Sequence, residues 1–453
     1  MLLTLAAFAV MIGILIFVHE AGHFLAAKAV GVQVHRFSLG FGKPLLSFKL
    51  GETEYCISAL PLGGYVKMAG LEEEGMMGSV EGGAPTEPVD PARAFDRKPL
   101  WARFIVMIAG VTMNMVLAYV VLVVWSATRG LPEPSTTQVD SVRAADLPPG
   151  AAALASLQFG DRLTQIDGKP MNGWLDIVDA IVNDSGPLRI AVAGRAGQLQ
   201  VTPGDGSRAA RLRVANAITP LQLPRFGLVQ PGSPAFRAKA KPGDVVIRVN
   251  GDTVRGWSDV LRGIWMSPGR PLHLDVERQG ELIALVVTPD SATAHDTVPG
   301  RPAVYGQIGV IADPAVRHVR QTWGEAVVNG FSEVGLQTAS IAGGLYQLVV
   351  GQVSLRKTLS GPVAIAQVSG QTVRLGADWY LSLLIAFSVN LALLNLLPIP
   401  ILDGGQVVFL LAEGIRRRPL SLEVRLRLTQ VGFIFIVVLM LFVVGNDVFN
   451  ILH

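Results

Sequence analysis

The stretch LIFVHEAGH, residues 15–23, places two histidines and a glutamate at the end of a long apolar segment. From Leu2 to Val18 every residue is apolar or small except Thr4. A run of this length and composition predicts a helix that spans a lipid bilayer. Ionisable side chains are costly inside a membrane, so their presence there indicates a functional site.

The composition agrees with a membrane fold. Of the 453 residues, 50% are hydrophobic and only 16% are charged, and the mean hydropathy is +0.44. Soluble domains are closer to a quarter charged, so we expect a polytopic α-helical membrane protein. The formal charge of +3, with no long run of lysines and arginines, gives no reason to expect a nucleic-acid partner. The single cysteine, Cys56, excludes an internal disulfide framework and a cysteine-rich zinc site.

Apolar segments of roughly 20 residues are expected to form about four transmembrane helices. The first lacks a positively charged start and a clear cleavage site before His19, so we interpret it as a retained span rather than a signal peptide. The expected spans are 1–29, 104–128, 377–405 and 428–450.

Basic residues set the expected orientation. The connecting segments 30–103 and 406–427 are rich in lysine and arginine, so the positive-inside rule assigns both to the cytosol. Both termini and the long middle region then lie outside. The segment 334–353 is uncharged and long enough to cross, which would invert the later spans. We therefore expect it to lie at the outer interface or dip into it, within an interfacial helical region, 311–376.

The middle region contains an internal repeat. GDRLTQIDGKPMNGWLDIVDAI begins at Gly160, and GDVVIRVNGDTVRGWSDVLRGI begins at Gly243 without gaps. Each copy predicts a strand, a DG or NG turn, a short strand and a helix. Two tandem α+β domains, 129–218 and 219–310, are expected, and they resemble PDZ domains, which capture extended peptides such as free C-termini. Use of the pair only as spacers or as a steric filter is the alternative.

The cytosolic segment 30–103 is expected to form a small membrane-associated β-region. Its residues alternate between apolar and polar on both sides of Gly51-Glu52, which is typical of a hairpin. A sheet edge beside a membrane site could bind a substrate backbone, whereas the alternative role is a structural cover. The candidate substrate-binding glycines are Gly40, Gly42, Gly63 and Gly64.

The H-E-A-G-H sequence predicts metal chemistry. On a helix, His19 and His23 lie on one face and can reach the same ion. Glu20 between them is placed to act as a general base on a water molecule at the metal. Because an apolar span would not retain three such residues without a use, we expect a metal site here.

A catalytic zinc site needs a third protein ligand and an open position. The best candidate is Asp403 in LDGG, which follows NLLPIPI where two prolines end the third span. The alternative for Asp403 is an N-cap of the helix that begins near Gly405. The two histidines and one aspartate suit Zn²⁺, although such a set could hold other divalent ions.

The expected depths of these residues agree. About 17 apolar residues precede His19, which corresponds to roughly 25 Å of helix measured from the outer surface. The metal is therefore expected toward the cytosolic leaflet. Asp403, at the inner end of a span that runs from outside to inside, can reach the same level.

Together these motifs resemble the site-2 protease family of intramembrane zinc metalloproteases, of peptidase M50 type. The resemblance covers nearly the whole sequence and includes FSLGFG (37–42), LPLGGYVKM (60–68) and SGPVAIAQ (360–367). It implies that His19, His23 and Asp403 bind Zn²⁺ and that Glu20 is the catalytic base. It also implies that Asn395, and less strongly Asn390, binds substrate. Either asparagine could instead form packing contacts between spans.

The resemblance further implies a location and a substrate class. Members act in the bacterial inner membrane on single-span proteins already trimmed on the periplasmic side. Such substrates are an anti-sigma factor in envelope-stress signalling and remnant signal peptides. A catalytically silent scaffold and a metal transporter are the alternatives. An intact Glu20 and Asp403 argue against the scaffold, and a set of three ligands at one depth argues against an ion path.

Overall fold

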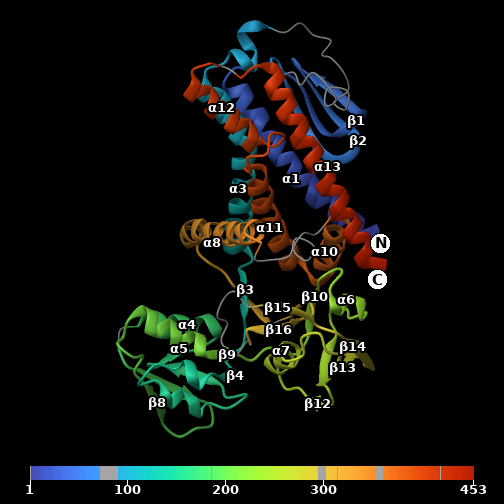
Figure 1. The fold of residues 1–453 in the computed structure, drawn as a ribbon. Helices are drawn as coiled ribbons and strands as arrows, with labels where there is room; N and C mark the ends of the chain where they lie inside the picture. Colours follow the sequence, from blue (N-terminus) through green and yellow to red (C-terminus); the bar gives the residue numbers. More distant parts are fainter. Residues whose placement is uncertain are drawn as a thin grey trace. The chain divides into compact units, whose positions relative to one another are not determined.

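The computed structural model describes residues 2–71, 90–184, 186–293, 302–313, 315–351, 361–418 and 420–452. The chain divides into two compact units, each described below by itself. The first unit comprises Met1–Ala127 and Thr322–Asp447, and the second comprises Thr128–Gln321 with Val448–His453. Figure 1 shows the elements along the sequence.

In the described part of the chain, four helices are long and apolar enough to cross a membrane. Their apolar side chains include many that are exposed on the helix surfaces, as expected where lipid rather than protein is the neighbour. The expectation of a polytopic α-helical membrane protein is confirmed. The four helices are α1 (Leu2–Ala29), α3 (Leu100–Thr128), α11 (Ala377–Asn395) and α13 (Leu422–Leu452).

The end of the third span differs from the expectation. Helix α11 stops at Asn395, and two prolines in the following turn prevent its continuation. A new helix, α12 (Asp403–Arg416), then begins, so most of the segment 406–427 is helical rather than a loop. Arg103 of α3 holds α12 through two hydrogen bonds of 2.6 and 3.0 Å to the carboxylate of Glu413.

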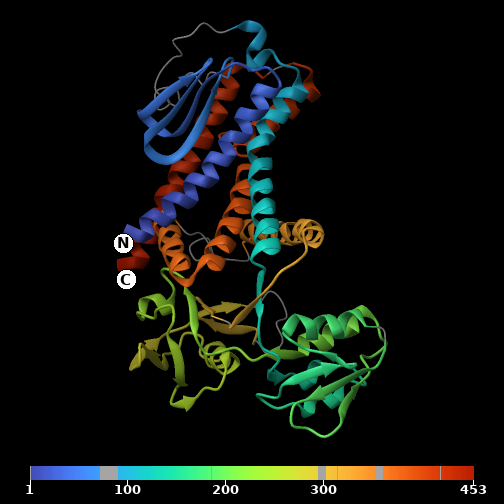
Figure 2. The same cartoon turned by 180° about the vertical axis from the view of Figure 1, so that it is seen from behind.

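Helix α8 (Trp323–Val349) lies across α3 and α11 instead of running alongside them (Figures 1 and 2). It starts with a capping box in which Thr322 and Glu325 satisfy each other's backbone N–H groups. The Tyr119 hydroxyl of α3 donates to the carbonyl of Val327 at 3.0 Å. Although α8 is apolar, it is not among the four candidate spans. The shorter helix α10 (Pro362–Leu375) follows.

Two long strands, β1 (Val34–Leu50) and β2 (Thr53–Met68), form the small sheet of the first unit. Each strand bends, so that one part of β1 pairs with two parts of β2: Phe37 is opposite both Tyr55 and Val66. The part of β2 from Gly64 to Met68 pairs with β1 along one side and has no strand on its other side in the described sheet. It therefore forms one edge of this sheet.

The second unit contains the two repeats predicted from the sequence, each built on a four-stranded antiparallel sheet. The strand orders are β6-β5-β7-β8 and β12-β11-β13-β14, so equivalent strands occupy equivalent places. Each sheet packs a helix, α4 or α7, and has its own apolar core. The strands and helices of the first repeat are β4 (Val139–Val142), β5 (Leu163–Ile166), β6 (Lys169–Pro170), α4 (Trp174–Asn183), β7 (Leu188–Val192), β8 (Gln198–Val201), α5 (Arg208–Ala217) and β9 (Ile218–Pro220). Those of the second are β10 (Phe226–Val229), α6 (Pro234–Arg237), β11 (Val245–Val249), β12 (Asp252–Thr253), α7 (Trp257–Trp265), β13 (Leu272–Arg278), β14 (Glu281–Val287), β15 (Asp290–Thr293), β16 (Val304–Gln307) and β17 (Val310–Ala312).

The DG and NG pairs form the expected tight turns. Asp167 and Gly168 have φ of 49° and 80°, and the equivalent Asn250 and Gly251 have φ of 53° and 91°. Two consecutive residues with positive φ between paired strands are the geometry of a type I′ turn, which favours Asn or Asp followed by Gly. The repeat in sequence is thus a repeat in backbone conformation.

Equivalent glycines, Gly173 and Gly256, precede α4 and α7 and are approached by different neighbours. A Cβ on Gly173 would lie 2.5 Å from Nε of Arg317, and one on Gly256 would lie 2.6 Å from Oδ1 of Asp140. Arg317 belongs to β18 (Val316–Val319), which pairs with β3 (Leu131–Pro134). The first repeat therefore contacts β18, whereas the second repeat contacts β4 of the first.

Candidate metal centre

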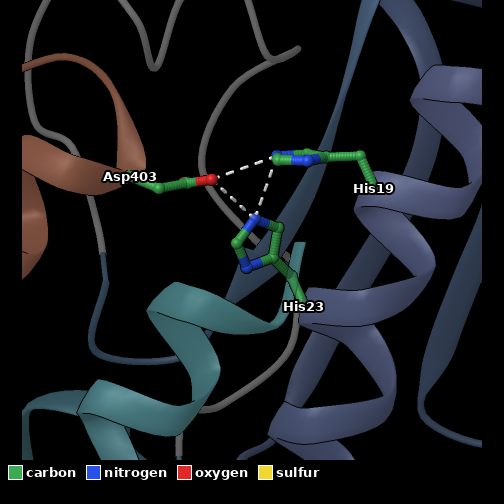
Figure 3. A group of neighbouring side chains, drawn as sticks. All are labelled: His19, His23 and Asp403. Atoms are coloured by element: carbon green, nitrogen blue, oxygen red, sulfur yellow. Dashed lines mark hydrogen bonds and ion pairs between the residues drawn. The ribbon is translucent and has the colours of Figure 1, made fainter. Parts of the chain in front are cut away.

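Helix α1 presents both histidines of the HEAGH motif on one face, because residues four apart are one turn apart. The Nε2 atoms of His19 and His23 are 3.2 Å from each other. Oδ2 of Asp403 lies 3.1 Å from Nε2 of His19 and 3.4 Å from Nε2 of His23 (Figure 3). Each of the three predicted residues thus places one candidate ligand atom within 3.4 Å of the other two.

The turn before α12 determines where Asp403 points. A Cβ on Gly404 would lie 2.2 Å from the carbonyl oxygen of Leu396, and one on Gly405 equally close to that of Ile399. Only glycines allow this close backbone approach. The helix begins at Asp403 itself, Leu402 is the N-cap residue, and no side chain makes a capping hydrogen bond. The alternative role of Asp403 as an N-cap was therefore wrong.

These atoms fit a divalent cation. Oδ2 of Asp403 is buried and has no hydrogen-bond donor in the described part of the chain, which is costly for a carboxylate without a compensating cation. Ligand atoms bonded at 2.0–2.1 Å to one tetrahedral zinc ion are about 3.3 Å apart, close to the observed separations. Two imidazole nitrogens and one carboxylate oxygen form a zinc-type donor set that leaves a fourth position open.

The face of α3 next to the histidines is shaped for them, and sequence reasoning missed it. A Cβ on Gly110 would lie 2.4 Å from Nε2 of His23 and 2.8 Å from Nε2 of His19. Nδ1 of His23 donates to the carbonyl of Val106 at 2.7 Å, which leaves Nε2 for a metal. Asn114, fully buried one turn further on, lies 3.4 Å from His19. The sequence did contain a signal for this face, namely a glycine followed four residues later by an asparagine within an apolar span.

Glu20 follows His19 on α1 and faces the small sheet. A Cβ on Gly64 would lie 2.8 Å from Cγ of Glu20, 2.9 Å from Cγ2 of Ile16 and 2.9 Å from the carbonyl oxygen of Ser38. The edge segment of β2 thus passes directly beside the glutamate, with no room for a larger residue than glycine. This contact brings the predicted base and one predicted substrate-binding glycine together.

The other three glycines predicted to bind substrate belong to the same sheet but have different surroundings. Gly63 is packed under a ring, since a Cβ there would lie 2.3 Å from Cε2 of Phe41. Gly40 and Gly42 have φ of 92° and 88°, which explains glycine at both positions. Around Gly42 there is open space. For Gly63 the structure thus shows a packing reason for glycine, and for Gly40 and Gly42 a conformational one.

The two candidate asparagines of α11 differ in position. Nδ2 of Asn395, at the end of the helix, lies 3.4 Å from Nε2 of His19, the atom that faces Asp403. Asn390 makes no hydrogen bond to the three candidate ligands within the described ranges. The structure therefore brings Asn395, but not Asn390, to the metal centre.

Comparison with known proteins gives a consistent family. A family model described as peptidase family M50 matches residues 7–439. The regulator of sigma-E protease RseP of Escherichia coli (strain K12) is 33% identical over 466 residues, 98% of each protein. Protease RseP of Yersinia pestis is 32% identical over 465 residues, also 98% of each. A candidate zinc metalloprotease of Neisseria meningitidis serogroup A is 32% identical over 467 residues, 99% of this chain and 98% of that one. The similarity therefore extends over both units.

Proposed function

Because this chain belongs to peptidase family M50 and is a zinc metalloprotease of the site-2 type, we propose that it hydrolyses peptide bonds within the spans of single-span membrane proteins. Its substrates are first trimmed on the periplasmic side. They comprise an anti-sigma factor in envelope-stress signalling and remnant signal peptides. Relatives named regulator of sigma-E protease support a role in the regulation of a sigma factor. The observation that carries this proposal is the convergence of His19, His23 and Asp403 among apolar helices.

The positions of the residues support the following roles. His19, His23 and Asp403 hold Zn²⁺, which when bound polarises the scissile carbonyl and makes a water molecule nucleophilic at neutral pH. Glu20, one residue from the first ligand, accepts the proton of the attacking water and passes a proton to the leaving amine. Asn395, beside His19, holds the substrate backbone in position for attack.

The protein is a multi-pass inner-membrane protein, and we propose a specific topology for it. Both termini and the two repeat domains are periplasmic, and the metal centre is toward the cytosolic leaflet. The basic segments 30–103 and 406–427 support this orientation through the positive-inside rule. Helix α8 supports it too, since it lies across its neighbours and adds no crossing. We place α8 at the outer interface, with the bilayer as its partner.

The edge of β2 is proposed to bind the substrate as an added strand. A substrate helix must unwind before hydrolysis, and lipid cannot satisfy the backbone groups that unwinding exposes. The edge segment 64–68 pairs with β1 on one side only and begins beside Glu20, so it can supply replacement hydrogen bonds next to the base.

Proline substitution tests this strand addition, because proline removes a backbone donor. Proline at Tyr65 or Lys67 should slow cleavage of a helical substrate, and a substrate with a helix-breaking Gly-Pro pair near the scissile bond should be affected less. If the proline variants cleave both substrates at the wild-type rate, strand addition is refuted.

The two repeat domains are proposed to be PDZ-like domains that act as a gate. The shared strand order and turn geometry of the copies support the PDZ-like assignment. The gate works either by capturing the new C-terminus of a trimmed substrate or by excluding untrimmed ones by size. Substrates ending in a carboxylate, an amide or a bulky folded domain separate the two cases. Loss of cleavage with the amide indicates capture, and loss only with the folded domain indicates exclusion.

The decisive test is cleavage of a short, pre-trimmed single-span reporter by the purified protein in detergent. Glu20→Gln should reduce the rate by about 10²–10⁴-fold, and a zinc chelator should abolish it reversibly. Stoichiometric zinc without cleavage of any trimmed reporter would favour a scaffold. Zinc uptake into vesicles would favour a transporter. Absence of bound metal would refute the proposal.

A further inference from the structure

Asn114 is a buried polar residue near the metal centre, and the proposed mechanism gives it no role. It lies on α3 with 0% of its surface exposed, one turn beyond Gly110. Its amide nitrogen is 3.4 Å from Nδ1 of His19, the ring atom on the side away from Asp403. Its amide oxygen is buried and has no hydrogen-bond partner among the described residues.

The protonation of His19 decides what Asn114 must offer. An imidazole that binds a metal through Nε2 is neutral and carries its proton on Nδ1, so Nδ1 becomes a donor. An amide NH₂ group facing that N–H would place two donors against each other. A half-turn of the amide exchanges its oxygen and nitrogen in nearly the same volume. The buried oxygen then accepts the proton of Nδ1, which satisfies both groups.

His23 provides an internal precedent for this arrangement. Its Nδ1 donates to the carbonyl oxygen of Val106 at 2.7 Å, while its Nε2 faces Asp403. Val106 and Asn114 are both on α3, two turns apart, so one helix faces the far side of each imidazole. A backbone carbonyl serves the second histidine. For the first, the structure places a side-chain amide in the equivalent role.

Asn114 is itself held in place from a third helix. Oγ of Ser388, which is fully buried on α11, donates to the backbone carbonyl of Asn114 at 2.7 Å. The same α11 ends at Asn395, which lies on the metal side of His19. The helix that bears the candidate substrate-binding residue thus also fixes the backbone that supports the first histidine.

We propose that Asn114 is a positioning residue for the metal centre, whose Oδ1 accepts the Nδ1 proton of His19 and thereby fixes its tautomer and ring plane. This inference rests on the proposed function, because it assumes that His19 binds Zn²⁺. Partners of this kind typically change metal affinity by 10–100-fold when they are removed.

The test measures metal affinity, independently of proteolysis, in the purified full-length protein. Asn114→Leu keeps similar volume but has no acceptor, whereas Asn114→Asp keeps an acceptor at the same place. Thr112→Val is the matched control, since the Thr112 hydroxyl on the same helix donates to the carbonyl of Ile108 and to no other described residue. Zn²⁺ affinity is measured by competition with a chromophoric chelator. The visible absorption of the Co²⁺-substituted protein reports the geometry of the ligands.

Asn114→Leu should weaken Zn²⁺ binding by about 10–100-fold and alter the Co²⁺ spectrum, while Asn114→Asp and Thr112→Val stay within about threefold of the wild type. The melting temperature of the metal-free forms shows whether Asn114→Leu folds. If it does not fold, the Asp variant decides: wild-type affinity supports the acceptor role and a loss of about 10-fold or more refutes it. Unchanged affinity in a folded Asn114→Leu refutes this inference alone. A wild-type protein without Zn²⁺ affinity refutes the proposed function as well.

Discussion

Two carboxylates connect α1 to other parts of the first unit, and their surroundings are opposite. Both oxygens of Glu52 receive cationic donors: Arg93 reaches them at 2.6 and 2.7 Å, and Lys28 of α1 at 2.5 Å. Oδ2 of Asp403 instead faces two imidazole nitrogens and has no hydrogen-bond donor in the described residues. The first carboxylate is neutralised by the protein's own cations, whereas the second faces the two histidines that are proposed to share a metal ion with it.

The comparison contrasts a structural carboxylate with a candidate metal ligand. Hydrogen bonds from Arg93, with a smaller contribution from Lys28, lower the pKa of Glu52 to about 2, so it is always ionised near neutral pH. This cluster joins the end of α1 to the turn between β1 and β2 and to the segment that leads into α3. At Asp403 the lack of such donors coincides with two facing imidazoles, and it is this combination that indicates a metal site.

The strongest test of this contrast replaces each carboxylate in turn by the corresponding neutral amide. Asp403→Asn should weaken Zn²⁺ binding by at least about 100-fold, since removal of a ligand exceeds the effect of a ligand's partner. Glu52→Gln should leave the affinity within about twofold, because Glu52 does not contact the ligands. Competition titration of both proteins checks this. Equal losses of Zn²⁺ affinity in the two variants would contradict a ligand role that is specific to Asp403.

The space around the ligands gives a second test. Gly110→Ala should weaken Zn²⁺ binding by about 10–100-fold, since the added methyl group would displace both imidazoles. Gly13→Ala is the matched control, because a Cβ on Gly13 meets nothing within 4 Å. The same titration serves for both, and melting curves show that each folds. Normal affinity in the Gly110→Ala protein would show that the histidines can move without loss.

The pH dependence of stability should expose the role of Glu52. Its pKa falls from the ordinary value of 4.5 to about 2 on folding. The ion pair therefore stabilises the protein fully above pH 4.5, and this contribution is lost as the pH falls toward 2. Glu52→Gln should cost about 1 kcal/mol at pH 7 and flatten the fall in melting temperature below pH 4.5. Glu423→Gln, at an exposed ion pair, is the control and should behave like the wild type.

The smallest effect is expected from Lys28. Lys28→Met removes one donor to Glu52 but leaves both hydrogen bonds from Arg93. The free energy of unfolding should fall by less than about 0.5 kcal/mol at pH 7, and the acid transition should stay close to that of the wild type. Thermal melting at pH 7 and pH 4 checks this. A loss as large as that in Glu52→Gln would assign the cluster's stability to the lysine.

The sequence could single out the candidate metal ligands because their signals are local. The spacing of His19 and His23 follows from helix geometry, and Asp403 follows two prolines and precedes two glycines. Gly110 and Asn114 could not be recognised in the same way. Their importance depends on which face of α3 turns toward α1, and that is decided by packing between helices rather than by spacing along one.

The same limit explains the differences in the fold. The segment 406–427 was expected to be a basic connection between two spans, yet α12 extends through it to Arg416, and Glu413 of α12 pairs with Arg103 of α3. The strands of the small sheet were predictable from alternation, but the double pairing of Phe37 was not. Pairing over long distances in sequence leaves no pattern within either partner.

The two glycines before α4 and α7 have a consequence for how the repeats can be rearranged. Duplicated domains often act as interchangeable modules, but here Gly173 accommodates Arg317 and Gly256 accommodates Asp140. Each copy has therefore been fitted to a different neighbour at the same corner. Exchanging the copies would separate Gly256 from Asp140, which lies on β4 of the first copy. Deleting the first copy would also leave Arg317 without Gly173 and Asp176. The tandem has a fixed order, and engineered chimeras of such proteins should transfer it as a single block.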